Sequence, residues 1–148
     1  MRFTVGVFLL LVPLVLGSVS AWAGVGRILS FEGDVQINGQ QITSDTVLNL
    51  DDTVVTGPDG SVQIVLSDNS VLDLDGDSQI NINDYSFNAT ESDENTSQIS
   101  VLAGTLRYVS GKIAKDDPEN VSFTAGTSTI GVRGTYISIS ICGDEVCD

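Results

Sequence analysis

The chain of 148 residues contains no histidine, and this absence excludes a large group of catalytic sites. Ser-His-Asp and Cys-His arrangements need an imidazole as their general base. The sequence also lacks a glycine-rich loop of the P-loop or dinucleotide-binding type. We therefore expect a protein that is not an enzyme, with no catalytic residues and no cofactor.

Positive charge is scarce as well. The chain has 6 lysines and arginines against 20 aspartates and glutamates, and its formal net charge is −14. Such a chain is a poor partner for nucleic acids and for anionic membrane surfaces. The charge fits a soluble, self-repelling exported protein, a cation binder or a protein that docks on a basic partner.

Long apolar runs are absent except at the start of the sequence. Residues 3–16 are apolar, and Ala21-Trp22-Ala23 matches a signal-peptidase cleavage pattern. The run is shorter than the roughly 20 residues that a membrane-spanning helix needs. We predict a signal peptide over residues 1–23, followed by one exported, periplasmic or extracellular domain over residues 24–148. After cleavage, the chain would have no stable membrane span.

Apolar and polar residues alternate with a period of two along most of the remaining chain. Turn residues recur about every 8–12 positions, which is typical of an all-β sandwich or barrel. We predict an all-β fold, either a two-sheet sandwich or a short β-helical (jelly-roll-like) coil, with mobile loops near residues 86–98 and 112–120. The alternating positions are Val35 and Ile37; Val62, Ile64 and Leu66; Leu72 and Leu74; Ile80 and Ile82; Ile99 and Val101; Leu106 and Tyr108; Val121 and Phe123; and Ile137, Ile139 and Ile141.

The only two cysteines lie close together at the end of the sequence, as Cys142 and Cys147. A disulfide is the usual state of such a pair in an exported protein. Two strands that leave a four-residue turn would bring these positions opposite each other, at a suitable distance. We expect a Cys142–Cys147 disulfide that staples the last turn, with a redox or metal role as the alternative.

One acidic segment suggests a ligand. Asp73, Asp75 and Asp77 occupy alternate positions around Gly76, and carboxylate oxygens are the ligands that Ca²⁺ prefers. The order of an EF-hand is not followed, so a solvated β-turn is the simpler interpretation. A weak calcium site remains the alternative.

A glycine-punctuated turn precedes the last alternating strand. Gly131 and Gly134 let the backbone turn on either side of Arg133, and Thr135 follows. Arg133 either locks this turn, through carbonyls or one of the many carboxylates, or binds an acidic partner. We favour the structural role, and Arg107 is a similar case.

This turn and strand resemble the signature near the end of FecR-type domains, in which "GVRGT" at residues 131–135 leads into an alternating strand. The resemblance extends over residues 24–141. Asp51 and Asn69 stand where the family motifs "GD-x-(L/I)-x-TG" and "L-x-DGS-x-(L/I)" have glycine. The segments similar to family motifs are residues 26–35, 50–57, 61–74, 101–107 and 124–125, together with Gly131, Arg133, Gly134 and Thr135.

The resemblance implies a function in protein–protein interaction during envelope sensing or signalling. Family members that regulate sigma factors carry a cytoplasmic segment and a membrane span before this domain. Only Met1 and Arg2 precede the apolar run here, so we expect a stand-alone form with an envelope protein as its partner.

The alternative function is an extracellular binding or structural module, for carbohydrate, calcium or envelope assembly. A carbohydrate site would need an exposed aromatic platform. The aromatic residues available for it are Tyr85, Phe87, Tyr108 and Tyr136.

Overall fold

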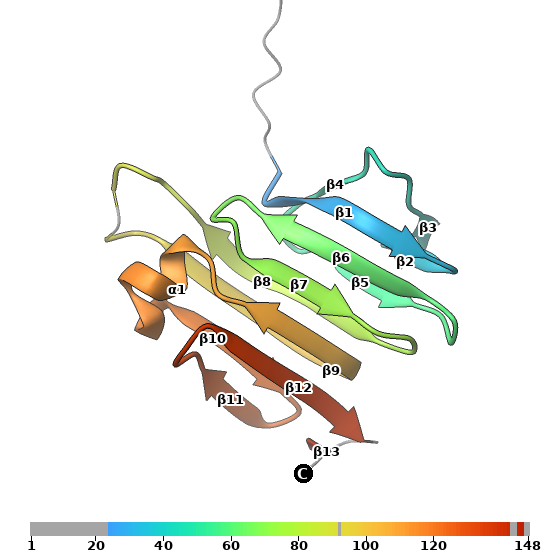
Figure 1. The fold of residues 1–148 in the computed structure, drawn as a ribbon. Coiled ribbons are helices and arrows are strands. Elements are labelled where there is room, and N and C mark those ends of the chain that lie inside the picture. The colour runs from blue at the N-terminus through green and yellow to red at the C-terminus, as the bar shows by residue number, and fades with distance from the viewer. Residues whose placement is uncertain (1–23, 92, 143–144, 147–148) are drawn as a thin grey trace, which may run out of the picture.

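The chain is built almost entirely from β-strands, as the alternation of its residues predicts (Figure 1). The computed structural model describes residues 24–91, 93–142 and 145–146. The predicted signal peptide, residues 1–23, lies outside the described residues. The predicted all-β fold class is confirmed.

The strands form two layers, and we name the first of them sheet A. Its neighbouring strands are all antiparallel within the described residues. In order across the sheet they are β4 (Val47–Leu48), β1 (Gly26–Glu32), β6 (Ser61–Leu66), β7 (Val71–Leu74), the second part of β9 (Thr96–Val109), β12 (Tyr136–Cys142) and β13 (Glu145–Val146).

The second layer, sheet B, has a parallel pair between β9 and β10 beside its antiparallel pairs. In order across the sheet its strands are β3 (Gln40–Gln41), β2 (Val35–Ile37), β5 (Thr53–Thr56), β8 (Gln79–Ser86), the first part of β9, β10 (Val121–Ala125) and β11 (Ser128–Gly131).

Strand β9 belongs to both sheets and joins them. Residues 96–103 pair with β8 in sheet B, whereas residues 104–109 pair with β12 in sheet A. The strand changes sheet at Gly104, which has a left-handed φ of +73°. The alternation shifts by one residue there, because Val101 points into the core before the bend and Leu106 points into it afterwards.

The strand order in both sheets follows the sequence, apart from the short strands β3 and β4 at the first edge. The chain passes repeatedly from one layer to the other and adds each new strand on the same side. The molecule is therefore a short β coil flattened into two layers, which combines the two architectures predicted from the sequence.

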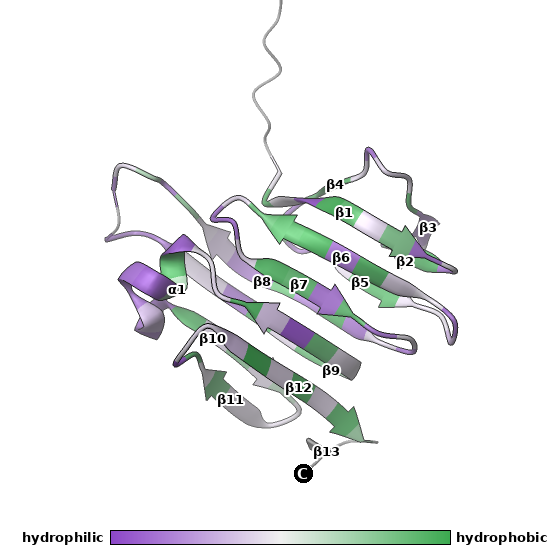
Figure 2. Ribbon diagram, in the orientation of Figure 1, coloured by the Kyte–Doolittle hydropathy of each residue, from purple (hydrophilic) through white to green (hydrophobic). Residues whose placement is uncertain are grey.

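One hydrophobic core lies between the sheets. Figure 2 shows apolar bands alternating with polar ones along β6 and β7. Val62, Ile64 and Leu66 on β6 are at most 2% exposed. Tyr108 and Phe123 meet edge to face, with ring centroids 5.0 Å apart and an angle of 61° between the planes. These burial values follow directly from the period-two pattern.

Two segments predicted as loops contain more regular structure than expected. Residues 112–120 form the helix α1 (Lys112–Asp116) and the 3₁₀ helix η1 (Pro118–Asn120). Ile113 and Ala114 of α1 are buried. Strands β8 and β9 also extend into the other predicted loop, leaving only residues 87–95 between them.

Candidate functional site

The glycine-punctuated turn connects β11 to β12. Gly134 needs to be glycine because its φ is +113°, whereas Gly131 has no left-handed backbone. Val132 is 2% exposed and anchors the turn in the core. The side chain of Ser110 donates a hydrogen bond to the Gly134 carbonyl at 2.7 Å, and its amide donates to the Thr135 carbonyl at 3.0 Å.

Arg133 lies exposed at the tip of this turn. Within the described residues, no hydrogen bond or ion pair joins Arg133 to a carbonyl or a carboxylate. Ser110, rather than Arg133, therefore holds the turn. This leaves the guanidinium of Arg133 available to a ligand, which is the second of the two roles considered from the sequence.

A hollow of about 510 Å³ lies between this turn and the helical segment. Arg133 and Lys115 are the charged residues among those that line it, and no carboxylate lines it. Lys115 also forms no ion pair with another described residue, whereas Lys112 on the same helix pairs with Asp116 at 3.0 Å. The hollow is lined by Ala114, Lys115, Pro118, Arg133, Gly134 and Thr135.

A buried carboxylate fixes the position of the helical segment. Asp68 is 1% exposed. It accepts hydrogen bonds from the Ser70 hydroxyl at 2.6 Å, the Ser70 amide at 3.1 Å, the Tyr85 hydroxyl at 3.1 Å and the Ile113 amide at 3.3 Å. The Asp68 carbonyl also accepts a hydrogen bond from the Lys112 amide at 2.8 Å. One side chain thus connects the β6–β7 turn to β8 and α1.

The two tyrosines near Asp68 stay protonated well above neutral pH. Burial, followed by the negative charge of Asp68, raises the pKa of Tyr85 far above its ordinary value. The same two causes raise the pKa of Tyr108 to about 12. Both hydroxyls belong to the packed interior rather than to a site of proton transfer.

Arg107 on β9 binds two of the three predicted calcium ligands. Its guanidinium donates two hydrogen bonds to the Asp75 carboxylate, at 2.8 and 2.5 Å, and one to Asp73 at 3.3 Å. The hydrogen bond to Asp75 is the main cause that raises the pKa of Arg107 above its ordinary value. The structural role expected for Arg107 is confirmed.

This pairing also concerns the weak calcium site that was considered as the alternative to a solvated β-turn. The guanidinium of Arg107 already occupies the space between Asp73 and Asp75 that a cation would need, and Asp77 lies in a tight turn with φ +54°. Among the described residues, no three histidine, cysteine, aspartate or glutamate side chains are grouped to hold a metal ion. The structure therefore gives the predicted site at Asp73, Asp75 and Asp77 no support.

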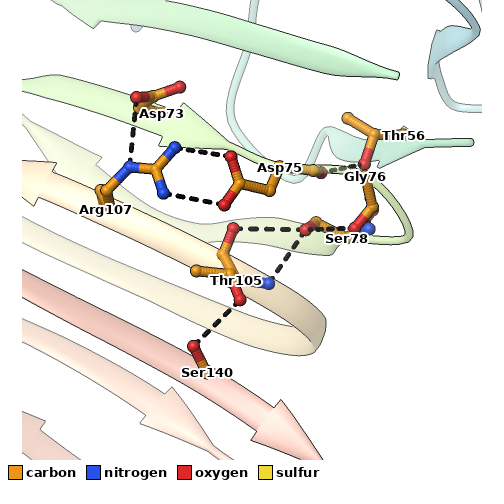
Figure 3. A network of polar contacts seen from close by, with 8 residues as sticks. All are labelled: Thr56, Asp73, Asp75, Gly76, Ser78, Thr105, Arg107 and Ser140. Atoms are coloured by element: carbon orange, nitrogen blue, oxygen red, sulfur yellow. Dashed lines mark hydrogen bonds and ion pairs between the residues drawn. The ribbon is translucent and has the colours of Figure 1, made fainter. Parts of the chain in front are cut away.

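A chain of hydrogen-bonded hydroxyl groups connects the strands next to the Asp75–Arg107 ion pair (Figure 3). The Thr56 hydroxyl donates to the Asp75 carbonyl at 2.6 Å and accepts from the Ser78 amide at 2.9 Å. The Ser78 hydroxyl donates to the Thr105 carbonyl at 3.2 Å and accepts from the Thr105 amide at 3.0 Å. The hydroxyls of Thr105 and Ser140 lie 2.9 Å apart, which extends the network to β12.

An apolar row crosses the outer face of sheet A. Val65 pairs with Val71, Val71 with Val109, and Val109 with Tyr136. Val109 is 43% exposed and Tyr136 is 57% exposed. We call these four residues the apolar row. A polar row runs beside it, in which Asp73 pairs with Arg107.

Comparison with known proteins identifies the family. The model of the FecR protein family matches residues 52–146, well over half of the chain. The chain belongs to the FecR family. No curated protein and no solved structure matches it. The resemblance noted in the sequence began earlier, at residue 24, so strands β1–β4 precede the part that the family model matches.

Membership of the FecR family places the protein among regulatory domains of the cell envelope that work in signalling with partner proteins. The helices in the described part of the chain are too short and too polar to span a membrane.

The backbone conformation explains two departures from the FecR motifs. Asp51 and Asn69 replace family glycines, and their φ angles are +64° and +63°. Glycine adopts this left-handed conformation at little cost, and asparagine and aspartate tolerate it better than other residues. The motif glycines therefore mark positions that need a left-handed turn.

We expect Asp51→Gly to stabilise the FecR domain by about 0.5–1 kcal/mol, because glycine relieves the left-handed strain. Asp51 is exposed and its side chain makes no hydrogen bond to another described residue. Urea unfolding measures the change. Asp45→Gly is the control, since Asp45 lies in an exposed turn without positive φ, and this variant should be slightly destabilised. Equal effects of the two changes would contradict the explanation.

The aromatic residues of the FecR domain do not form the exposed platform that a carbohydrate site would need. Tyr85 is 9% exposed and Tyr108 is 1% exposed. Phe87 packs partly buried against the core. Tyr136 is the only one of the four that is largely exposed, and it belongs to the apolar row.

Cys142 ends β12, a strand of the last hairpin. Strand β13 pairs with β12 so that Cys142 lies opposite Glu145. The sequence predicted Cys142 directly opposite Cys147, whereas the described register places Cys142 opposite Glu145. Cys147 lies outside the described residues, so the Cys142–Cys147 disulfide stays a prediction.

Proposed function

We propose that this FecR-family protein is exported to the periplasm or beyond, is not an enzyme, and acts by docking on another envelope protein in sensing or signalling. Family membership supports the signalling role, and the predicted signal peptide at residues 1–23 supports export. The apolar row on the outer face of sheet A is the observation that carries the docking proposal.

The apolar row has the properties of a contact surface. Its four side chains are adjacent across four strands and form one continuous strip, and two of them are more than 40% exposed. In the described part of the chain, no element packs over this face of sheet A. Contiguous exposed apolar surface of this kind typically marks an interaction site. Tyrosine is also a residue that commonly contributes strongly to binding energy at interfaces.

The negative charge of the whole chain indicates the kind of partner. The chain has a net charge of −14, while Asp73 and Asp75 beside the apolar row are paired with Arg107. A complementary surface would have an apolar centre and a basic rim. We therefore expect the partner to be an envelope protein with such a surface.

The proposal is tested by capture from an envelope extract with the tagged full-length chain. We expect one protein to be recovered, and its binding to be reproduced with the purified partner. Tyr136→Ser and Val109→Thr should each weaken this binding at least about tenfold, since each removes apolar contact area at one of the two most exposed residues of the row. Titration of the purified pair measures the effect.

Leu102→Ser is the matched control. Leu102 is 52% exposed, like the residues of the row, but it lies on the part of β9 that pairs in sheet B. This change should leave binding intact. If the row variants bind the purified partner as tightly as the unchanged protein, or if Leu102→Ser weakens binding equally, the docking face is not the apolar row.

A further inference from the structure

Strand β11 leaves one side of sheet B open. Within the described residues, β11 pairs only with β10, so its other side faces no strand. Its sequence, Ser128-Thr-Ile-Gly131, contains neither a charge nor a proline, and its pairing with β10 shows no bulge. Charges, prolines and bulges are the devices that normally prevent a further strand from adding to an edge. This edge is therefore open to another strand.

Gly131 at the end of β11 has no role within the fold that requires glycine. Its φ is outside the left-handed region, and a Cβ atom placed on it would meet no other atom within 4 Å. A glycine within a strand often marks the close approach of another backbone. The free space beside Gly131 fits a backbone that comes from outside the described chain.

The end of β11 continues into the turn that lines the hollow containing Lys115 and Arg133. One residue, Val132, separates Gly131 from Arg133, and both cations lack an ion pair within the described residues. Aspartates and glutamates also lie in the helical connection between β9 and β10, but none of them lines the hollow. One of them, Asp116, is paired with Lys112. In a chain with a net charge of −14, this is a local positive site.

We infer that the β11 edge and the hollow together bind an extended acidic peptide segment of another protein. The peptide adds as a strand to β11, its backbone passes close to Gly131, and one of its carboxylates lies between Lys115 and Arg133. Strand addition supplies the backbone hydrogen bonds, while the two cations select an acidic side chain.

The negative charge of the whole protein does not prevent this binding. At physiological ionic strength, interactions are screened over about 8 Å. Exposed carboxylates elsewhere on the molecule are therefore screened from the peptide, whereas a carboxylate in the hollow is in direct contact with the two cations. The site is separate from the apolar row, because it uses the edge of sheet B rather than the outer face of sheet A.

The test is a selection of random decapeptides on the full-length protein, followed by affinity measurements on the enriched peptides. We expect enrichment of aspartate and glutamate within extended sequences. Lys115→Ala combined with Arg133→Ala should weaken binding at least about tenfold. Lys112→Ala removes the same type of charge outside the hollow and should leave the affinity unchanged.

Gly131→Val tests the strand addition. Valine has space there and suits a strand, so thermal unfolding should be unchanged while peptide binding falls at least about tenfold. Methylation of alternate peptide nitrogens should abolish binding, because it removes the backbone donors. A peptide that binds Gly131→Val normally, or that glutarate alone displaces completely, would overturn strand addition.

The selection also separates this site from the proposed docking face. Tyr136→Ser should leave peptide binding unchanged, and loss of peptide binding in that variant would overturn the assignment to β11. Enriched peptides without acidic residues, or no enrichment above an empty support, would overturn it as well. If the apolar-row variants do not weaken binding of the envelope partner, the assignment of the peptide site to β11 still stands.

Discussion

Replacing Asp68 by alanine should destabilise the protein by about 3 kcal/mol. Asp68 is 1% exposed and accepts hydrogen bonds from Ser70, Tyr85 and Ile113. Hydrogen bonds to a charged group contribute about 1.5–3 kcal/mol, and buried donors left without a partner cost about 1–3 kcal/mol each. Urea unfolding followed by circular dichroism measures the loss.

Two further variants test whether the loss of stability is specific to the buried carboxylate of Asp68. Asp84→Ala removes an exposed carboxylate from β8 and should change stability by less than about 0.5 kcal/mol. Asp68→Asn keeps one acceptor oxygen but turns an N–H₂ group towards donors, so its stability should lie between those of the alanine variant and the unchanged protein. If Asp68→Ala is as stable as Asp84→Ala, the buried network does not hold α1 in place.

Replacing Gly104 by alanine should cost about 3 kcal/mol or more. The residue has a φ of +73°, and a Cβ atom there would lie 2.3 Å from the Ser78 hydroxyl and 2.6 Å from the Asp77 carbonyl. The left-handed conformation costs a non-glycine residue about 1–2 kcal/mol, and overpacking adds about 1–3 kcal/mol. Because Gly104 is where β9 changes sheet, both sheets should lose stability together in a single unfolding transition.

Gly131→Ala is the matched control for Gly104→Ala. Gly131 also lies at a strand position, but its backbone is not left-handed and its surroundings are open. We expect its unfolding midpoint in urea to stay close to that of the unchanged protein. Equal losses in the two variants would show that the bend in β9 has no special requirement for glycine.

The strands and the core were predictable from the sequence because they depend on a local pattern. Alternation at residues 62–66 and 72–74 correctly placed Val62, Ile64, Leu66, Leu72 and Leu74 inside. Period-two burial requires nothing beyond the pleat of a strand. The same logic placed Ile139 of β12 inside.

The helical segment could not be predicted because a distant residue holds it. Helix α1 has five residues, and its N-cap, Gly111, makes no side-chain capping bond. Its first turn is instead bound by Asp68, which is 45 residues away from Ile113. A helix this short has little stability of its own, so its sequence carries no clear signal.

In the candidate sites too, local motifs were predictable from the sequence and contacts between distant residues were not. The glycine turn around Arg133 was visible as a motif, but its contacts were not, because Ser110, which holds the turn, is separated from it by 24 residues. The ion pairs of Asp73 and Asp75 were not visible for the related reason that Arg107 reaches Asp75 from a strand 32 residues further on. Pairing between distant charges is set by strand register, and the sequence alone does not show that register.

The ordering of strands along both sheets has a consequence for how the polypeptide folds. Apart from the hairpins, neighbouring strands such as β1 and β6 or β7 and β9 lie a full turn of the coil apart in the sequence, so most contacts join residues at least 12 positions apart, and proteins dominated by such non-local pairings fold slowly for their size. A chain that leaves a ribosome or a translocation pore with its amino end first can lengthen the coil strand by strand. Until the next strand emerges, the growing edge of each sheet stays unpaired, so slow folding prolongs the time in which these edges are exposed to aggregation.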